Sequence, residues 1–154
     1  MAISRLGYGV LNAVNLEFSQ PFWDTKVEIF NYVAEEKGVW AETINMGYYL
    51  GKPILCMFAS GTFGKAIEKM TEKQVIDSAM TVLKKIWPKA TQPIKIAMSR
   101  WNSDPFSYGS YSFSAVGVEQ PKDRNALKET VAGRIFFAGE ATSVNAPATT
   151  QGAY

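Results

Sequence analysis

Residues 133–142 read Gly-Arg-Ile-Phe-Phe-Ala-Gly-Glu-Ala-Thr, and residues 147–154 read Pro-Ala-Thr-Thr-Gln-Gly-Ala-Tyr. The apolar run 135–138 contains aromatic and β-branched residues between glycines, which predicts a buried strand. Gly139 and Glu140 follow at its carboxyl end, where ligands bind in open α/β sheets. Pro147 is expected to begin a helix, because the first helical turn does not need the missing N–H. The segment indicates a cofactor-binding corner, although the same pattern also fits the plain end of an α/β domain.

The residue identities in these two stretches are more specific than the pattern. They closely resemble the C-terminal FAD-binding segment of the flavin-containing amine oxidases, a family that includes polyamine oxidases, monoamine oxidases and lysine-specific histone demethylases. The resemblance implies that Gly139, Glu140 and the backbone of Thr150 contact FAD. It also implies that Thr149 lines the substrate site, where polyamine oxidases often have an aromatic residue and the histone demethylases have threonine.

Composition limits the remaining classes of function. The chain has 154 residues, 47% of them apolar and 19% charged, which is typical of a globular domain. Its formal net charge is +2 with interleaved signs, so we expect no nucleic-acid partner. No apolar run approaches the roughly 20 residues of a membrane span, and no signal-peptide core is found at the start. We expect no membrane partner and a cytoplasmic location, with which the single cysteine, Cys56, is compatible.

The sequence contains no histidine. This excludes a Ser–His–Asp or Cys–His hydrolase within the chain. Together with the single cysteine, it also argues against a zinc, haem or iron–sulfur site, so we expect no metal. Any chemistry would therefore rely on an organic cofactor.

The hydrophobic pattern predicts more strands than helices. Strands are expected at residues 10–18, 27–33, 39–46, 54–59 and 94–101, and the continuously apolar run 54–59 is expected to be central. A helix is expected from the N-cap Thr71, with Gln74 completing a capping box, to Pro88. A short helix near 65–70 and a helical turn within 119–130 are also expected. This order favours an α+β fold over a strictly alternating α/β order. The resemblance to the amine oxidases implies a mixed, mostly antiparallel sheet flanked by helices.

Residues 100–113 form an aromatic-rich loop that could be either a corner of the core or a wall around a planar ligand or a cationic amine. Its order, Arg-Trp, Asp-Pro-Phe and Gly-Ser-Tyr-Ser-Phe, is similar to the loop that precedes the flavin in the amine oxidases. The resemblance implies that Trp101, Phe106 and Ser110 line FAD and that Tyr111 lines the substrate. Monoamine oxidases have a flavin-bonded cysteine at the position of Ser110, so FAD here is expected to be non-covalent.

Two glycine motifs that partly resemble phosphate-binding loops are expected to be ordinary turns. Gly61-Thr-Phe-Gly-Lys65 lacks the spacing of a Walker loop, and Gly7-Tyr-Gly9 lacks the third glycine of a dinucleotide fingerprint.

Residues 6–14 resemble an amine oxidase segment in which a lysine stands at the position of Ala13. In the family that lysine holds a water against flavin N5 and is thought to assist the reaction with oxygen. Its absence implies slow oxidase turnover, a different electron acceptor or no catalysis. No catalytic residue is assigned.

The resemblance extends over about residues 3–154. It divides the chain into a substrate-domain-like segment, 1–132, and a truncated C-terminal FAD-binding segment, 133–154. The Gly-x-Gly-x-x-Gly fingerprint that cradles FAD is not present in this sequence. We therefore expect a fragment of an amine oxidase that oxidises a small amine or polyamine by hydride transfer to flavin N5, with the isolated chain inactive and binding FAD weakly or not at all.

A second hypothesis is a non-catalytic, substrate-domain-like binding or interaction module. In either case, the surface that would face the missing FAD-binding domain should be apolar and should promote self-association.

Overall fold

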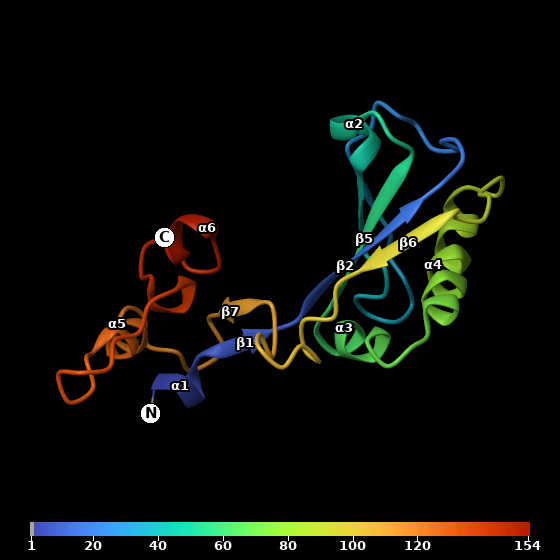
Figure 1. Ribbon diagram of the computed structural model, residues 1–154. Helices are drawn as coiled ribbons and strands as arrows, with labels where there is room; N and C mark the ends of the chain where they lie inside the picture. The colour runs from blue at the N-terminus through green and yellow to red at the C-terminus, as the bar shows by residue number, and fades with distance from the viewer. Residues whose placement is uncertain (1) are drawn as a thin grey trace. The chain divides into compact units, whose positions relative to one another are not determined.

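The computed structural model describes residues 2–154, which form two compact units. The sheet unit is Val10–Tyr108, and the terminal unit comprises residues 2–9 and Gly109–Tyr154. Figure 1 shows helices and strands in both units. All paired strands among the described residues are antiparallel, so the predicted α+β class is confirmed. The family-based division between residues 132 and 133 stays a prediction.

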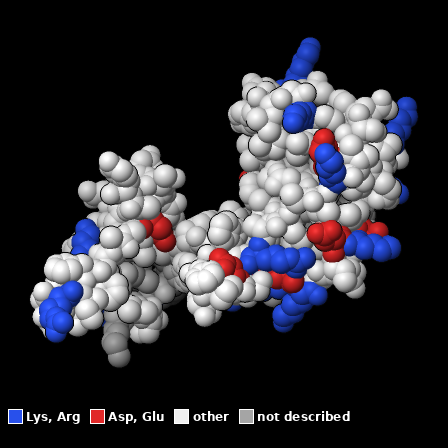
Figure 2. Space-filling view, in the orientation of Figure 1, with Lys and Arg blue, Asp and Glu red and all other residues white. Residues whose placement is uncertain are grey.

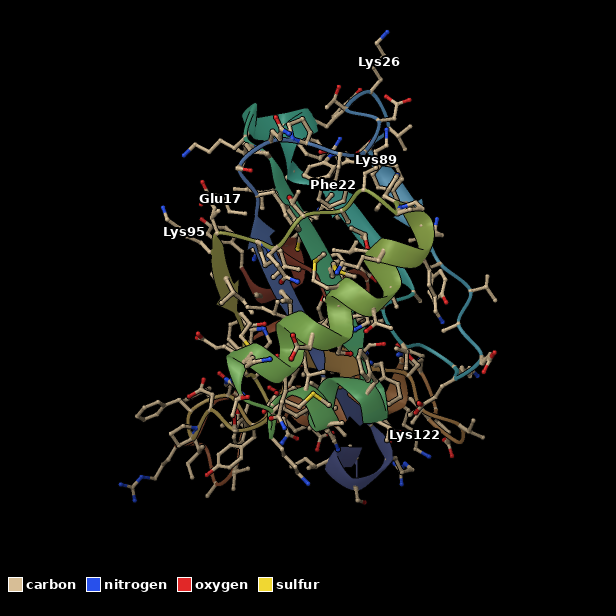
Figure 3. All side chains as sticks on the ribbon, turned by 90° about the vertical axis from the view of Figure 1, so that its right-hand side faces the viewer. Glu17, Phe22, Lys26, Lys89, Lys95 and Lys122 are labelled. Atoms are coloured by element: carbon tan, nitrogen blue, oxygen red, sulfur yellow. The ribbon has the colours of Figure 1, made fainter. Side chains whose placement is uncertain are left out.

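The sheet unit contains a five-stranded sheet with the order β3-β4-β5-β2-β6. Its strands are β2 (Leu11–Glu17), β3 (Ile29–Asn31), β4 (Glu42–Asn45), β5 (Ile54–Ser60) and β6 (Lys95–Met98). The apolar β5 lies between β4 and β2, as predicted for a strand buried on both faces. Glu17 of β2 lies opposite Lys95 of β6, and their charged atoms are 3.7 Å apart (Figure 3).

Helix α4 (Glu72–Ile86) packs across one face of this sheet (Figure 3). Thr71 and Gln74 form the predicted capping box. The helix buries Val75, Ala79 and Leu83 against strand residues that include Val14 and Leu16. The 3.6-residue period therefore identified the helix and its buried face correctly.

Several predicted boundaries in the sheet unit were wrong. The strand expected to reach Met46 ends at Asn45, because the Asn45 side chain accepts a hydrogen bond from Gly47 N–H and caps α2 (Met46–Leu50). The helix expected near 65–70 is α3 (Gly61–Ile67), which contains the glycine pair predicted as a turn. Gly64 allows close packing there, since a Cβ would lie 2.7 Å from the Ala59 carbonyl oxygen.

The terminal unit contains short elements. These are α1 (Ala2–Arg5), β1 (Gly7–Gly9), β7 (Tyr111–Phe113), α5 (Lys122–Lys128), the 3₁₀ helix η1 (Glu140–Thr142) and α6 (Thr150–Ala153). β1 pairs with β7, so the Gly7–Gly9 motif is a strand rather than the predicted turn. The Phe113 ring occupies the space that a Cβ on Gly7 would need, so a larger residue at position 7 would displace this ring.

The predicted buried strand at 135–138 was wrong. Within residues 2–154, this run makes only the isolated bridge between Val131 and Ile135, and Phe136 and Phe137 are 75% and 54% exposed. Apolar composition alone does not make a strand, because a strand also needs a neighbouring edge with which to pair.

Pro147 does not begin the last helix, contrary to prediction. Ala148 has φ 57°, a left-handed conformation that interrupts a right-handed helix. Thr149 is instead the N-cap of α6, and its hydroxyl oxygen accepts a hydrogen bond from Gly152 N–H at 3.1 Å. The helix therefore begins at Thr150.

Charges of both signs are mixed on the face seen in Figure 2. Among residues 2–154, no helix combines the length and the apolar character that crossing a membrane requires.

Candidate functional site

The predicted site residues lie in both units. Ala13, Trp101 and Phe106 belong to the sheet unit, and the terminal unit holds Ser110, Tyr111, Gly139, Glu140, Thr149 and Thr150.

In the sheet unit, a buried asparagine anchors the aromatic loop. Asn12 is 0% exposed, and its Nδ2 donates to the Gly64 carbonyl at 3.1 Å and to Glu68 Oε1 at 2.8 Å. Its Oδ1 accepts from Ser99 Oγ at 3.2 Å and from Trp101 N–H at 3.1 Å. Asn12 thus uses donors and acceptors together, which is how a buried amide is stabilised. The sequence analysis missed it, because a lone polar residue in a strand does not reveal which face it occupies.

Glu68 holds the next residues of the loop. Its carboxylate accepts from the backbone N–H of Asn102 at 2.9 Å and of Ser103 at 2.8 Å. Burial alone would raise the pKa of Glu68, but the hydrogen bonds from Asn12, Asn102 and Ser103 outweigh it and lower the pKa. The Arg100 guanidinium donates to the backbone carbonyl of Glu68. Loop residues 100–103 are therefore fixed to the end of α3.

The rings carried by this loop point toward solvent. Trp101 is 43% exposed and Phe106 is 94% exposed. Asp104 shapes the turn, because its carboxylate accepts from Phe106 N–H at 3.1 Å and from the Ser107 hydroxyl. These bonds lower the pKa of Asp104, with the Ser107 hydroxyl contributing most. Of the two interpretations left open by the sequence, a buried aromatic corner does not describe these exposed rings.

In the terminal unit, the Glu140 carboxylate is the centre of a second network. Its Oε1 accepts from Ser112 N–H at 2.7 Å, and its Oε2 accepts from Ser112 Oγ and from Ala148 N–H, each at 2.8 Å. Burial would raise the pKa of Glu140, but the hydrogen bonds from Ser112 and Ala148, helped by the charge of Arg124, lower it. The carboxylate is therefore held ionised.

Two buried charged residues on α5 support this region. Arg124 is 1% exposed, and its Nη1 donates to Ser112 Oγ and to the Ala141 carbonyl, each at 2.9 Å. Asp123 is 0% exposed and pairs with Arg5. The Arg5 hydrogen bonds lower the pKa of Asp123 to about 2. Sequence reasoning missed both residues, because adjacent charges on a polar helix ordinarily face solvent.

The remaining predicted residues are close in sequence to Ser112, Glu140 or Ala148, the residues of the Glu140 network. Tyr111 lies in β7 and is 38% exposed, and the preceding Ser110 N–H donates to the Gly9 carbonyl at 2.8 Å. Thr149 and Thr150 are exposed at the start of α6. Gly139 has φ 122° with open space where a Cβ would project, so glycine leaves its backbone accessible to a ligand.

Comparison with known proteins identifies the family. A family model described as "Flavin containing amine oxidoreductase" matches residues 1–154. The chain belongs to this family. Polyamine oxidase 4 of Oryza sativa subsp. japonica is similar to this chain, with 37% identity over 153 residues, which cover 99% of the chain and 31% of the relative.

Two further relatives give the same assignment. Polyamine oxidase 2 of Arabidopsis thaliana is 38% identical over 153 residues, 99% of the chain and 31% of the relative. Lysine-specific histone demethylase 1 homolog 1 of Oryza sativa subsp. japonica is 37% identical over 159 residues, 99% of the chain and 19% of the relative. The chain thus spans about a third of the length of the polyamine oxidases and a fifth of that of the demethylase. The predicted family is confirmed.

Proposed function

We propose that this chain forms the substrate side and a C-terminal cofactor contact of an FAD-dependent amine oxidase. The supporting comparisons are the family match over the whole chain and relatives named as polyamine oxidases and histone demethylases. The substrate would be a small amine or polyamine in neutral form, which loses a hydride from the carbon beside its nitrogen. When bound, FAD supplies the hydride acceptor at its N5 atom.

The observation that carries this proposal is the rigid presentation of exposed aromatic rings. Trp101 is exposed although its backbone N–H is tied to buried Asn12, and Tyr111 is exposed beside the Glu140 network. Large exposed apolar side chains on a fixed backbone are typical of ligand sites. A flat ring face suits a planar cofactor or the charge of a cationic amine.

The residues present fit FAD at the level of their chemistry. The open backbone at Gly139 allows close approach of a ligand, and exposed Trp101 and Phe106 offer apolar surface to a planar ring. By family resemblance, Ser110 and the backbone of Thr150 would also contact FAD. Because Ser110 provides no thiol, FAD would be held without a covalent bond. The chain's contribution would be to bind, orient and exclude water, which favours transfer by positioning.

Ala13 stands where the amine oxidases usually have a lysine, and this difference is expected to affect turnover. It lies in β2, and its backbone N–H donates to Ser99 Oγ at 2.9 Å, while its methyl side chain carries no donor or acceptor. It cannot hold a water as a lysine would. We propose slow reoxidation by oxygen, use of another electron acceptor or loss of catalysis at this step.

The alternative function is a non-catalytic binding or interaction module. The observation that favours it is the exposed apolar run that includes Ile135, Phe136 and Phe137, beside a hollow of about 450 Å³ lined partly by Ile3 and Leu127. Such a surface would pack on an FAD-binding domain or on a second copy. Light scattering across a concentration series tests self-association, and a constant monomer mass at high concentration would reject it.

Flavin absorption tests whether the isolated chain holds FAD by itself. We expect that the chain alone, mixed with FAD and then freed of unbound flavin, shows no visible flavin band, because it has no pyrophosphate-binding glycine motif. A retained stoichiometric band would show that the chain holds FAD by itself and would reject the expected weak binding. We also propose a cytoplasmic location without membrane or nucleic-acid partners, which microscopy of a tagged full-length protein would test.

A chimera tests the enzymatic proposal directly. In it, this chain replaces the matching segment of Oryza sativa polyamine oxidase 4, and unmodified polyamine oxidase 4 is the positive control. The chimera should retain FAD, and Trp101→Ala should reduce that retention. A matched control is Trp40→Phe, since Trp40 is fully buried in the sheet unit and offers no exposed ring to a ligand. Equal retention in the Trp101→Ala chimera would contradict the cofactor role of Trp101.

A further inference from the structure

The Glu140 carboxylate joins two segments that are far apart in the sequence. It accepts hydrogen bonds from the backbone N–H of Ser112 at 2.7 Å and of Ala148 at 2.8 Å. Ser112 directly follows Tyr111, and Ala148 directly precedes Thr149. One side chain therefore fixes the backbone beside both residues that are proposed to face the substrate.

We propose that Glu140 is a positioning residue that sets the placement of Tyr111 relative to Thr149 and thereby the width of the amine site. The inference rests on the proposed function, because these two residues face a substrate only in an amine oxidase. It deepens that function by giving Glu140 a task inside the protein in addition to the contact with FAD expected for it.

The backbone at Ala148 provides independent support. Its φ of 57° lies in the left-handed region, which is unfavourable for alanine. Such conformations persist where surrounding contacts determine them, and they cluster at functional sites. The hydrogen bond from Ala148 N–H to Glu140 is charge-assisted and is made by this strained residue itself.

The charges around the carboxylate favour the same role. Ser112 Oγ donates to Glu140 Oε2 and accepts from Arg124 Nη1 of α5, so the buried guanidinium reaches the carboxylate through one hydroxyl. Arg124 also donates to the carbonyl of Ala141, the residue after Glu140. Arg124 is the charged group that acts on Glu140 from the packed elements of the described chain. An ionised carboxylate can accept from both amides at once, and a neutral one is a poorer acceptor.

Amide hydrogen exchange in the isotopically labelled chain tests this placement. In Glu140→Ala, the Ser112 and Ala148 amides should both exchange roughly ten- to hundredfold faster, the loss expected for hydrogen bonds to a charged group. In Glu140→Gln, only one side-chain oxygen remains, so one of the two amides should keep its protection and the other should lose it. The matched control is Glu129→Ala, an exposed glutamate after α5.

A pH titration supplies a readout that general loss of structure would not produce. The Tyr111 ring and Thr149 methyl resonances should shift together with one midpoint below the usual glutamate range, and Glu140→Gln should abolish that step. Independent midpoints, an unchanged step in Glu140→Gln, or unchanged protection of both amides in that variant would overturn the proposal. If Glu140→Ala unfolds the terminal unit, the glutamine variant decides. These measurements need no flavin, so a chimera that fails to oxidise amines would reject the proposed function without altering them.

Discussion

Removing the Asn12 amide should destabilise the sheet unit more than removing any comparable side chain on the same strand. In Asn12→Ala, the Gly64 carbonyl and the Trp101 N–H lose their side-chain partner. Glu68 keeps two backbone donors, and Ser99 Oγ still accepts from a backbone N–H, so these two groups lose less. At about 1–3 kcal/mol for the buried Gly64 carbonyl left unpaired, and less for the part-buried Trp101 N–H, the free energy of unfolding should fall by about 3 kcal/mol. This is a large part of the stability of an ordinary domain.

The matched control is Asn15→Ala. Asn15 is the same residue type three positions along β2, and the alternation of the strand places it on the opposite, half-buried face. Urea unfolding followed by circular dichroism gives both free energies by linear extrapolation. We expect a loss below about 1 kcal/mol for the control, as for a substitution away from a buried network. Equal losses in the two variants would refute the argument that Asn12 anchors the aromatic loop.

Three further predictions concern single contacts. Thr71→Ala should lower the free energy of unfolding by about 1 kcal/mol, because it removes the N-cap of α4. Thr81→Ala, on the exposed surface within the same helix, should lower it less. Equal decreases in melting temperature for the two variants would contradict this prediction. Leu83→Ala should cost about 2–5 kcal/mol in urea unfolding because Leu83 is fully buried, and a loss below that of Thr81→Ala would show that the site collapses without a cavity. The pKa of Asp123 is about 2 in the folded chain, below its unfolded value, so its pairing with Arg5 stabilises the fold at neutral pH and loses that effect as pH falls from about 4 toward 2. The stability difference between wild type and Asp123→Asn should shrink over that interval, and a difference independent of pH would exclude this pairing as its source.

Local sequence patterns correctly predicted the helices and strands whose periodicity, capping residues or apolar runs are visible in the sequence. The helix ending near Ile86 follows from its 3.6-residue period and from a cap between Thr71 and Gln74, which are three residues apart. The central β5 follows from its apolar run. The boundaries were wrong where a side chain redirected the backbone, as Asn45 does by capping α2.

The candidate site depends on contacts that no local pattern reports. Asn12 meets Glu68 across 56 positions of sequence, and Glu140 meets Ser112 across 28. Family resemblance supplied Trp101 and Glu140 as candidates, and their contacts with FAD stay predictions. The apolar run 135–138 was predicted to be a strand because of its composition. A strand also needs the free edge of a neighbouring strand with which to form hydrogen bonds, and composition does not show whether one is present.

The most direct test of the account is the visible spectrum of the flavin-loaded chimera when an amine or polyamine is added without oxygen. The account predicts that the flavin band bleaches as the amine is oxidised, and that Tyr111→Ala weakens bleaching at low amine concentration more than at saturation. A chimera that retains FAD but is bleached by no amine, while polyamine oxidase 4 is bleached under the same conditions, would contradict the claim that this chain forms the substrate side of an amine oxidase.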